Sequence, residues 1–443
     1  MTLRLNVEAL TQVASHCDVF RTAGKLRSVR ELLTATLPAS IGELCEIRTS
    51  NDDRLLAEVV GVSDDLSQIM CFHAPTGLRP GCEVIATGRR ARVPVGPGLL
   101  GRVLNGLGQP IDQNGPLGVR RWRTVGETAP PAMQRNRITE PLATGQRAID
   151  GLLTLGKGQR VGLFAGSGVG KSTLLGEIAK HAQADLNVIC LVGERGREVL
   201  PFLEDCLGKQ GQARSVVIVA TSDETPLMRI QAVRSAIAIA NDFREQGADV
   251  LFFLDSLTRL AFAQREIGLL RGEPPGTRGY PPSVQTILAT TLEQLGNDHR
   301  GSITGLITVL VDGDDMDEPI ADAARSILDG HIVLDRKIAA RGQYPAIDVL
   351  HSVSRLSRDV SSPEHQKSAG RFRQMLANYR EMEDLIQMGM YQQGASPQID
   401  EAIRQMPAML EFLKQDVNEF SPLETTISRL QQFQAVPNGA ARA

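Results

Sequence analysis

The sequence predicts an α/β protein in three parts: a small β-barrel near the N-terminus, a central domain built on a mostly parallel sheet, and a helical domain near the C-terminus. Three observations lead to this prediction. Short strand patterns separated by turns rich in Gly, Asp and Pro fill residues 19–92, strand and helix patterns alternate between residues 160 and 254, and helical patterns alone follow Arg358.

Length, charge and cysteine content exclude several classes of protein. With 443 residues the chain is long enough for two or three domains. Its net charge of −3 lacks the basic surplus of a nucleic-acid-binding domain, so we expect no nucleic-acid partner. The six cysteines show no C-x-x-C or zinc-like spacing, which indicates reduced thiols in a cytosolic protein. The N-terminus lacks a signal-peptide pattern and no apolar run approaches a membrane span, so we expect any membrane contact to be peripheral.

The first element is a short helix predicted over residues 6–16. Asn6 is a suitable N-cap, and the apolar residues that recur on one helical face are Val7, Leu10, Val13 and Cys17. Such a helix either packs on its own domain or binds a partner, and the sequence favours neither.

Residues 19–92 contain strand candidates at close spacing, among them Cys45–Arg48, Leu55–Val59 and Val84–Ala86. This spacing is typical of a small β-barrel, and no catalytic pattern is visible within it. The Pro- and Gly-rich stretch 94–98 marks the boundary with the next domain.

The central domain alternates strands and helices in the way expected of a parallel sheet covered by helices. The predicted elements are strand 160–165, helix 171–182, strands 187–192 and 215–220, helix 226–246 and strand 250–254. Gly247 suits the position just beyond the long helix. Because ligands bind at the carboxyl ends of such strands, functional side chains are expected there.

The most specific stretch is GLFAGSGVGKSTL at 162–174, which predicts a strand, a phosphate-binding loop and a helix. The loop residues expected to contact a bound polyphosphate are Gly166, Ser167, Gly168, Val169, Gly170, Lys171, Ser172 and Thr173. Glycines let the backbone N–H groups turn inward, Lys171 reaches the β and γ phosphates, and the Ser172 hydroxyl can bind Mg²⁺. The first glycine of the usual pattern is Ala165 here, which is tolerable because a strand end needs no positive φ.

Two further strand ends carry carboxylates. Glu194 follows the strand 187–192, where it could polarise a water in line with the γ phosphate. Asp255 follows the apolar run 250–254, which is the form expected of the residue that holds the Mg²⁺ shell. Each signal is weak alone, and each becomes specific beside a phosphate loop.

Two later features have more than one interpretation. The acidic cluster 312–318 is not a calcium loop, because Met316 stands at the third ligand position and no glutamate closes the loop, so we interpret it as a polar turn beside the nucleotide site. Tyr344 offers an aromatic face that could stack on adenine, or it is an ordinary packed surface tyrosine.

Helices are predicted at 367–388, 397–414 and 422–433, and residues 434–443 have the composition of a frayed tail. The sequence Ser421-Pro422-Leu423-Glu424 predicts a capping box with proline at the first helical position.

With these motifs in place, the chain resembles the export ATPases of bacterial flagella and of type III secretion, which are relatives of the catalytic subunit of rotary ATP synthase. The resemblance covers nearly all of residues 20–433. It is carried by GLLGRVLNGLGQPID at 99–113, AGSGVGKST at 165–173, LVGERGREV at 191–199, DSLTRLAFAQREIGL at 255–269, GEPPGTRGYPPSV at 272–284 and ILDGHIVLDRKIAARGQYPAIDVLHSVSR at 327–355. It implies a RecA-like P-loop domain that hydrolyses ATP with Mg²⁺.

The resemblance implies roles for the residues at the strand ends. Glu194 would activate the attacking water, Lys171 would bind phosphate, and Ser172 would bind Mg²⁺. Asp255 would order the water shell of the metal.

It also implies roles for three arginines and a tyrosine. Arg259 and Arg195 would lie near the γ phosphate, and Tyr344 would flank adenine. Arg355 would be an arginine finger that reaches the site of a neighbouring subunit, which implies a homohexameric ring.

The resemblance implies partners, a location and domain limits as well. The N-terminal helix within residues 1–18 would hold a stator-like regulator, and the loop 272–283 would line the central hole of the ring. Further partners would be export-gate components, export substrates and their chaperones, at the cytoplasmic face of the inner membrane. The expected domains are the barrel at 19–92, the ATPase domain at 93–358, the helical domain at 359–433 and a flexible tail at 434–443.

Alternative functions stay open at this point. A rotary synthase subunit would carry an acidic lever motif, in place of which residues 381–385 show only scattered acidic residues. An RNA translocase would have an aromatic-rich barrel, but residues 19–92 contain two phenylalanines and no tyrosine or tryptophan. A non-catalytic ring subunit would be expected to lack Glu194 or Lys171, and both are present. Between the two export systems, the loop AGSGVGKS favours the flagellar one.

Overall fold

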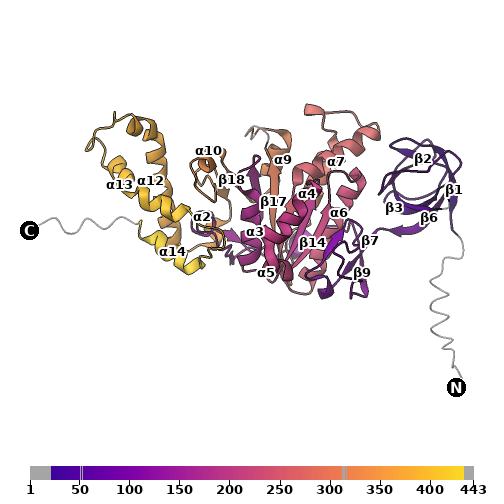
Figure 1. Ribbon diagram of the computed structural model, residues 1–443, viewed down its shortest axis with the longest axis horizontal. Coiled ribbons are helices and arrows are strands. Elements are labelled where there is room, and N and C mark those ends of the chain that lie inside the picture. Colours follow the sequence, from indigo (N-terminus) through magenta and orange to yellow (C-terminus); the bar gives the residue numbers. More distant parts are fainter. Residues whose placement is uncertain (1–20, 50, 52, 312–314, 316, 434–443) are drawn as a thin grey trace, which may run out of the picture. The chain divides into compact units, whose positions relative to one another are not determined.

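The computed structural model describes residues 21–49, 51, 53–311, 315 and 317–433 (Figure 1). The described chain forms two compact units: one reaches Ala91 and includes Ile267–Glu273, and the other contains Arg92–Glu266 and the chain from Pro274 onward. The predicted helix at 6–16, the predicted tail at 434–443 and most of the acidic cluster at 312–318 lie outside the described residues.

The first unit contains a closed antiparallel barrel with the strand order β1-β2-β5-β4-β3-β6. The strands are β1 (Ala23–Ser28), β2 (Leu33–Ala35), β3 (Glu43–Arg48), β4 (Arg54–Ser63), β5 (Leu66–Cys71) and β6 (Glu83–Arg90). The predicted barrel is therefore confirmed, and each of the three strand candidates lies within a strand. Alternate apolar side chains such as Leu26, Ile47 and Val84 fill its interior and are fully buried.

The second unit is organised around a mostly parallel sheet with the order β19-β18-β12-β17-β15-β13-β14-β8. The strands are β8 (Val103–Asn105), β12 (Arg160–Ala165), β13 (Leu186–Val192), β14 (Ser215–Ala220), β15 (Asp249–Asp255), β17 (Ser302–Leu310), β18 (Gly330–Leu334) and β19 (Val353–Ser354), and β16 (Gly296–Asn297) pairs with β17. Strand β19 runs antiparallel to β18. The predicted parallel sheet is confirmed.

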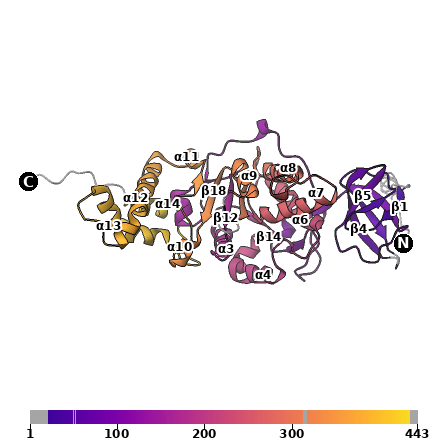
Figure 2. The same cartoon turned by 90° about the horizontal axis from the view of Figure 1, so that it is seen from above.

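The connections run in two directions along this sheet. From β12 through β13 to β14, the connections contain α3 (Lys171–His181), α4 (Gly196–Pro201) and α5 (Gly208–Ala213). On the return from β14 to β18, the connections contain α6 (Pro226–Glu245), α7 (Leu257–Leu270), α8 (Pro282–Glu293) and α9 (Pro319–Ile327). Right-handed crossovers place these two sets on opposite faces. Figure 2 shows α3 and α4 on one side of the strands, with α8 and α9 on the other. The crossover direction reverses between β12 and β17, which is where such folds bind ligands.

The elements predicted for this domain are confirmed to within one or two residues, including the end of α6, where Gly247 has a φ of 92°. The sequence reading missed β17, which lies in the middle of the sheet. Nearly all of its residues are buried, polar ones such as Thr304 and Thr308 included, so its sequence shows no alternation of apolar and polar residues that would mark a strand. Strand and turn signals between Gly101 and Gly118 do not delimit the edge strand β8, which has three residues.

The C-terminal part is helical, as predicted, with α12 (Pro363–Gln387), α13 (Pro397–Leu413) and α14 (Leu423–Gln431). The rings of Phe372, Phe412 and Phe433 pack together with centroids 5.0–6.1 Å apart. The predicted capping box is wrong. Pro422 is the N-cap and not the first helical residue, and the Ser421 hydroxyl bonds to Thr426 Oγ1 at 2.8 Å instead of capping the helix.

Short elements connect these parts. They are β7 (Arg92–Val95) paired with β9 (Arg121–Thr124), β10 (Pro141–Leu142) paired with β11 (Leu155–Gly156), and the helices α2 (Arg147–Leu152), α10 (Arg336–Ala340) and α11 (Ser357–Val360). A π-helical turn spans Phe202–Leu207, and short 3₁₀ turns span Pro97–Leu99, Ala132–Gln134 and Thr277–Gly279. None of the helices in the described ranges is both long and apolar enough to cross a bilayer.

Candidate active site

The phosphate loop has the geometry that its sequence predicts. Strand β12 lies between β18 and β17 and ends at Ala165, and Gly170 is the N-cap of the 11-residue helix α3. Gly168 and Gly170 have φ values of 79° and 87°, a left-handed conformation that side chains with a Cβ disfavour. The loop therefore presents backbone N–H groups at a helix N-terminus, where an anion binds favourably.

Lys171 lies between two carboxylates at this edge of the sheet. Its Nζ is 2.5 Å from Asp255 Oδ1 at the end of β15 and 3.6 Å from Glu194 Oε1 beyond β13. The side chains of Lys171, Glu194 and Asp255, each predicted just beyond or at the end of a strand, are thus brought together.

Asp255 is held by a residue that sequence reasoning did not single out. The Thr308 hydroxyl, on β17, lies 2.7 Å from Asp255 Oδ1 and 2.8 Å from the carbonyl oxygen of Leu254. Thr308 therefore fixes the carboxylate beside Lys171. The β-branched run that contains Thr308 was the available signal, but recognising it depends on knowing that β17 is the neighbour of β15.

The electrostatics of the site follow from burial and from these pairs. Burial raises the pKa of Glu194, and the negative charge of Asp255 adds to the rise, while Lys171 and Arg259 oppose it. For Lys171, burial lowers the pKa, but the carboxylates of Asp255 and Glu194 outweigh burial, so the pKa lies above its ordinary value. Lys171 therefore stays charged.

Arg259 lies on the first turn of α7, next to the turn that carries Glu194. A Cβ built on Gly193 would lie 2.8 Å from Arg259 Cβ, so Gly193 permits this close approach. The Nε of Arg259 is buried and has no hydrogen-bond partner among the described residues. An unpaired buried N–H beside a phosphate loop is suited to donate a hydrogen bond to an anionic ligand.

The other two arginines make contacts outside this cluster. The Arg195 guanidinium is 67% exposed and pairs with Glu198 at 3.3 Å. Arg355 is exposed, and its Nη2 donates to the carbonyl of Arg325 at 3.0 Å.

Arg355 lies at the end of the sheet opposite the phosphate loop. It follows Ser354, which pairs with Gly330 at the start of β18, and β18 runs parallel to β12. The length of β12, at about 3.3 Å per residue, separates this end from the loop by roughly 20 Å. Arg355 therefore does not reach the phosphate loop of its own chain.

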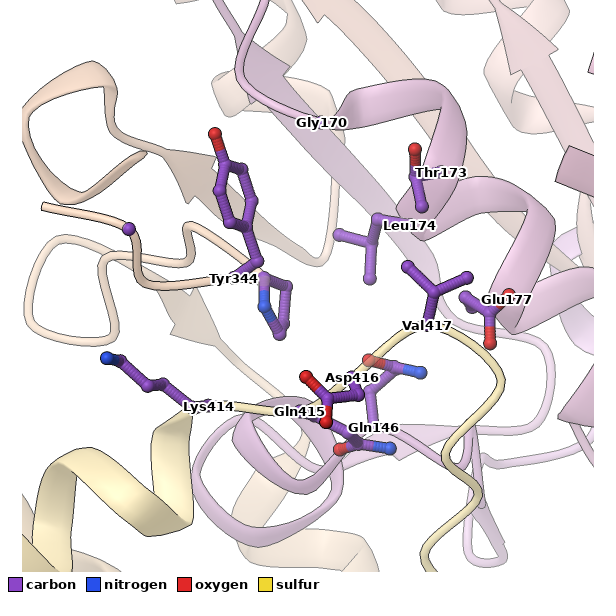
Figure 3. A pocket seen from close by; sticks show the side chains of 12 residues that line it. Gln146, Gly170, Thr173, Leu174, Glu177, Tyr344, Lys414, Gln415, Asp416 and Val417 are labelled. Carbon is purple, nitrogen blue, oxygen red and sulfur yellow. The ribbon is translucent and has the colours of Figure 1, made fainter. Parts of the chain in front are cut away.

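A cavity of about 340 Å³ opens beside the loop. Figure 3 shows Tyr344 on one side of it, Thr173 and Leu174 of α3 on the other, and the segment 414–417 crossing below. Tyr344 is 48% exposed, and its ring edge would lie 3.5 Å from a Cβ on Gly170. The sequence predicted Tyr344 here but missed the segment 414–417, which follows α13 in the connection to α14.

The oxygen donors at the site suit Mg²⁺. Ser172, whose hydroxyl belongs to an exposed residue at the start of α3, and the carboxylate of Asp255 are hard ligands of the kind that this ion prefers. Within the described residues no three His, Cys, Asp or Glu side chains gather into a closed metal site. The hydroxyl of Ser172 and the carboxylate of Asp255 fit Mg²⁺ bound by one or two protein oxygens together with substrate phosphates.

Three family models match separate parts of the chain. The ATP synthase alpha/beta family, nucleotide-binding domain, matches residues 145–354, and the beta-barrel domain of the same family matches residues 33–88. The T3SS EscN ATPase C-terminal domain matches residues 361–432.

Curated relatives and solved structures agree with these matches. The flagellum-specific ATP synthase of Bacillus subtilis is 49% identical over 96% of this chain and 98% of its own, and the type 3 secretion system ATPase of Xanthomonas euvesicatoria is 50% identical over 90% of each chain. The structure of the assembled ATPase EscN from the type III secretion system of enteropathogenic E. coli superposes with a TM-score of 0.88 at 40% identity, covering 93% of this chain and all of that one. The chain belongs to the ATP synthase alpha/beta family, within the group of flagellar and type III secretion ATPases.

Proposed function

We propose that this chain hydrolyses ATP to energise or gate protein secretion through a flagellar-type, type III export apparatus. The observation that carries the proposal is the position of Lys171 at the phosphate loop, within 3.6 Å of Glu194 and 2.5 Å of Asp255. The chain that holds this site is about half identical to a flagellum-specific ATP synthase and to a type 3 secretion system ATPase. The match of residues 361–432 to the T3SS C-terminal domain favours this function over a rotary synthase subunit. Because Lys171 and Glu194 are both present and adjacent, a non-catalytic ring subunit is disfavoured.

Each residue of the site has a task in this reaction. The loop amides and Lys171 bind the β and γ phosphates, and Glu194 accepts a proton from the attacking water. Arg259 lies beside Glu194 with an unpaired Nε and meets negative charge on the transferring group. Ser172 and Asp255 would hold Mg²⁺, which supplies positive charge to the transferring phosphoryl group when bound.

Arg355 completes the site of a second copy of the chain. In its own chain it lies at the far end of the sheet, so its proposed contribution as an arginine finger requires an oligomer. The EscN relative is described as assembled, which supports a ring; we propose a homohexamer. We propose that Arg195 exchanges its ion pair with Glu198 for a position near the γ phosphate when ATP binds.

The partners and location are proposed on the same basis. EscN has been solved with its central stalk EscO, which supports a regulator partner for this chain. We propose that residues 1–18 bind a stator-like regulator, that the loop 272–283 lines the central hole, and that the ring binds export-gate components, substrates and chaperones at the cytoplasmic face of the inner membrane. Domain limits of 19–92, 93–358 and 359–433 remain the proposed division. Relatives named for the two systems are 49% and 50% identical, so the flagellar assignment rests on the loop sequence AGSGVGKS.

The raised pKa of Glu194 predicts the acid limb of the pH profile. The deprotonated carboxylate is the base, so we expect kcat/KM to fall with falling pH around a midpoint above about 4.3, the ordinary glutamate value. The effect of pH on the free energy of unfolding has the opposite sign, because the folded state binds the proton of the Glu194 carboxyl more tightly than the unfolded state does. The stability that Glu194 contributes is therefore present at low pH and is lost as the pH rises through the pKa of the folded state. A kcat/KM profile with its midpoint at or below the ordinary value contradicts the assignment.

The proposed function is tested by turnover in vitro and export in cells. Purified protein is expected to release phosphate from ATP with Mg²⁺, and an excess of EDTA is expected to reduce release to background. In cells, Lys171→Ala is expected to accumulate as the wild-type protein does but to export no substrate. An oligomer that binds ATP without splitting it would instead indicate the non-catalytic subunit.

A further inference from the structure

Gln146 is a buried glutamine that lines the cavity beside Tyr344 (Figure 3). It is 3% exposed, yet its side-chain amide makes no hydrogen bond to any of the residues that the structure describes. Buried polar side chains almost always have a partner. An amide without one at the wall of a cavity is therefore available to a ligand.

The fold does not use this side chain. Gln146 is the N-cap of α2, a position where a side chain often bonds to the helix N–H groups, but its own does not. The preceding turn is instead held by Asp150, whose carboxylate accepts hydrogen bonds from the N–H and hydroxyl of Thr144 at 2.8 and 2.7 Å and from the N–H of Gly145 at 2.9 Å. No local role in helix capping explains the amide of Gln146.

The backbone around Gln146 is tied to the opposite wall of the cavity. The N–H of Arg147 donates to Gln415 Oε1 at 2.8 Å, and Gln415 Nε2 donates to the carbonyl of Gly145 at 2.7 Å. The N–H of Gln415 in turn donates to the carbonyl of Tyr344 at 2.9 Å. These bonds hold the backbone on either side of Gln146 in a fixed relation to the backbone of Tyr344.

The other buried polar side chains that line the cavity already have partners. Gln415 is used as above, and Glu177 accepts from Lys180 Nζ at 2.6 Å and from the N–H of Asn418 at 2.8 Å. Among the described lining residues, Gln146 thus supplies the buried amide that is free to bind a ligand.

We propose that Gln146 reads the hydrogen-bonding edge of the nucleobase and makes the site prefer adenine. A glutamine amide offers one donor and one acceptor side by side. Adenine presents its amino group next to a ring nitrogen, which pairs with this amide, whereas guanine presents two acceptors on the N7 edge. A base without the matching groups leaves the buried amide unpaired, and that is the condition under which a polar site rejects an analogue. The inference depends on the proposed function, which places a nucleotide in this cavity.

The experiment compares nucleotide binding to the full-length protein by calorimetry. The ligands are ADP, GDP and purine riboside diphosphate, which lacks the 6-amino group. We expect the wild-type protein to bind ADP about tenfold more tightly than the amino-free analogue, and Gln146→Leu to lose that preference. Gln146→Met serves as a second, unbranched replacement. The control is the same change at an exposed glutamine on α5, Gln210→Leu, which is expected to keep the preference.

The outcomes separate this inference from the proposed function. Equal affinity of the wild-type protein for ADP and the amino-free analogue, or a preference that survives in both Gln146 variants, overturns the role of Gln146 and leaves the ATPase function standing. A wild-type protein that binds none of the three nucleotides overturns both.

Discussion

Replacing Glu194 by glutamine is expected to lower kcat for ATP hydrolysis by about 10³-fold, within the range that positioned general bases contribute, while ADP still binds. Glutamine keeps the size of the side chain and its place near Lys171, but it cannot accept the proton of the attacking water. Because Lys171 is held chiefly by Asp255 at 2.5 Å, the phosphate loop is expected to keep its arrangement. The measurement is steady-state phosphate release, together with the Kd for ADP by calorimetry.

The control for this prediction is Glu204→Gln, which makes the same chemical change at an exposed carboxylate in the turn Phe202–Leu207. Its kcat should match that of the wild-type protein. If Glu194→Gln retained a wild-type kcat, Glu194 would not be the base.

Replacing Arg355 by alanine is expected to have a comparable or larger effect, about 10³–10⁵-fold in kcat, the range measured for arginine fingers. This expectation is informative because Arg355 lies at the opposite end of the sheet from its own phosphate loop, so no contact within one chain explains such a loss. The affinity for ADP in an isolated protomer should be unchanged. The readout is kcat of the assembled variant, with Arg358→Ala, an exposed arginine of α11, as the control.

An Arg355→Ala protein that assembles and hydrolyses ATP at the wild-type rate would show that the arginine is not part of the site. A protein that no longer assembles would be recognised by its sedimentation, in which case Arg355→Lys keeps the charge, allows assembly and should still show a reduced kcat, because lysine lacks the planar fork of arginine.

Those parts of the site that depend on local sequence could be predicted. The turn from β12 into α3 requires positive φ at residues 168 and 170, and glycine, the residue that adopts this conformation without strain, stands at both positions. Glu194 and Asp255 each follow an apolar run, and in a parallel sheet such strand ends meet at one edge, so their proximity to Lys171 follows from the alternation of elements.

Parts that depend on long-range packing could not be predicted. Thr308 orients Asp255 only because β17 lies beside β15, and the order of strands is not contained in the pattern of any one strand. The segment 414–417 lines the cavity beside Tyr344 through contacts such as the hydrogen bond from Gln415 to Tyr344. These two residues lie far apart in the sequence. Gln146 gave no signal, because a glutamine before a short helix is ordinary until its lack of partners is seen.

The error at Ser421 has a local physical cause. The four residues fit a capping box by type, but the box requires the serine to stand at the N-cap with its hydroxyl toward the helix. In the structure Pro422 takes the N-cap position, and the serine hydroxyl is used by Thr426 instead. The helix α14 nevertheless begins within one residue of the predicted start.

The central claim is that the phosphate loop and Glu194 of one protomer work with Arg355 of another. It is tested most directly by mixing Glu194→Gln and Arg355→Ala proteins, each nearly inactive alone, and measuring ATP turnover of the assembled mixture. A protomer with intact Glu194 next to one with intact Arg355 restores a working site, and for equal random mixing about a quarter of sites are restored. Turnover far above that of either variant is the predicted result, and a mixture no more active than its two components would contradict the account.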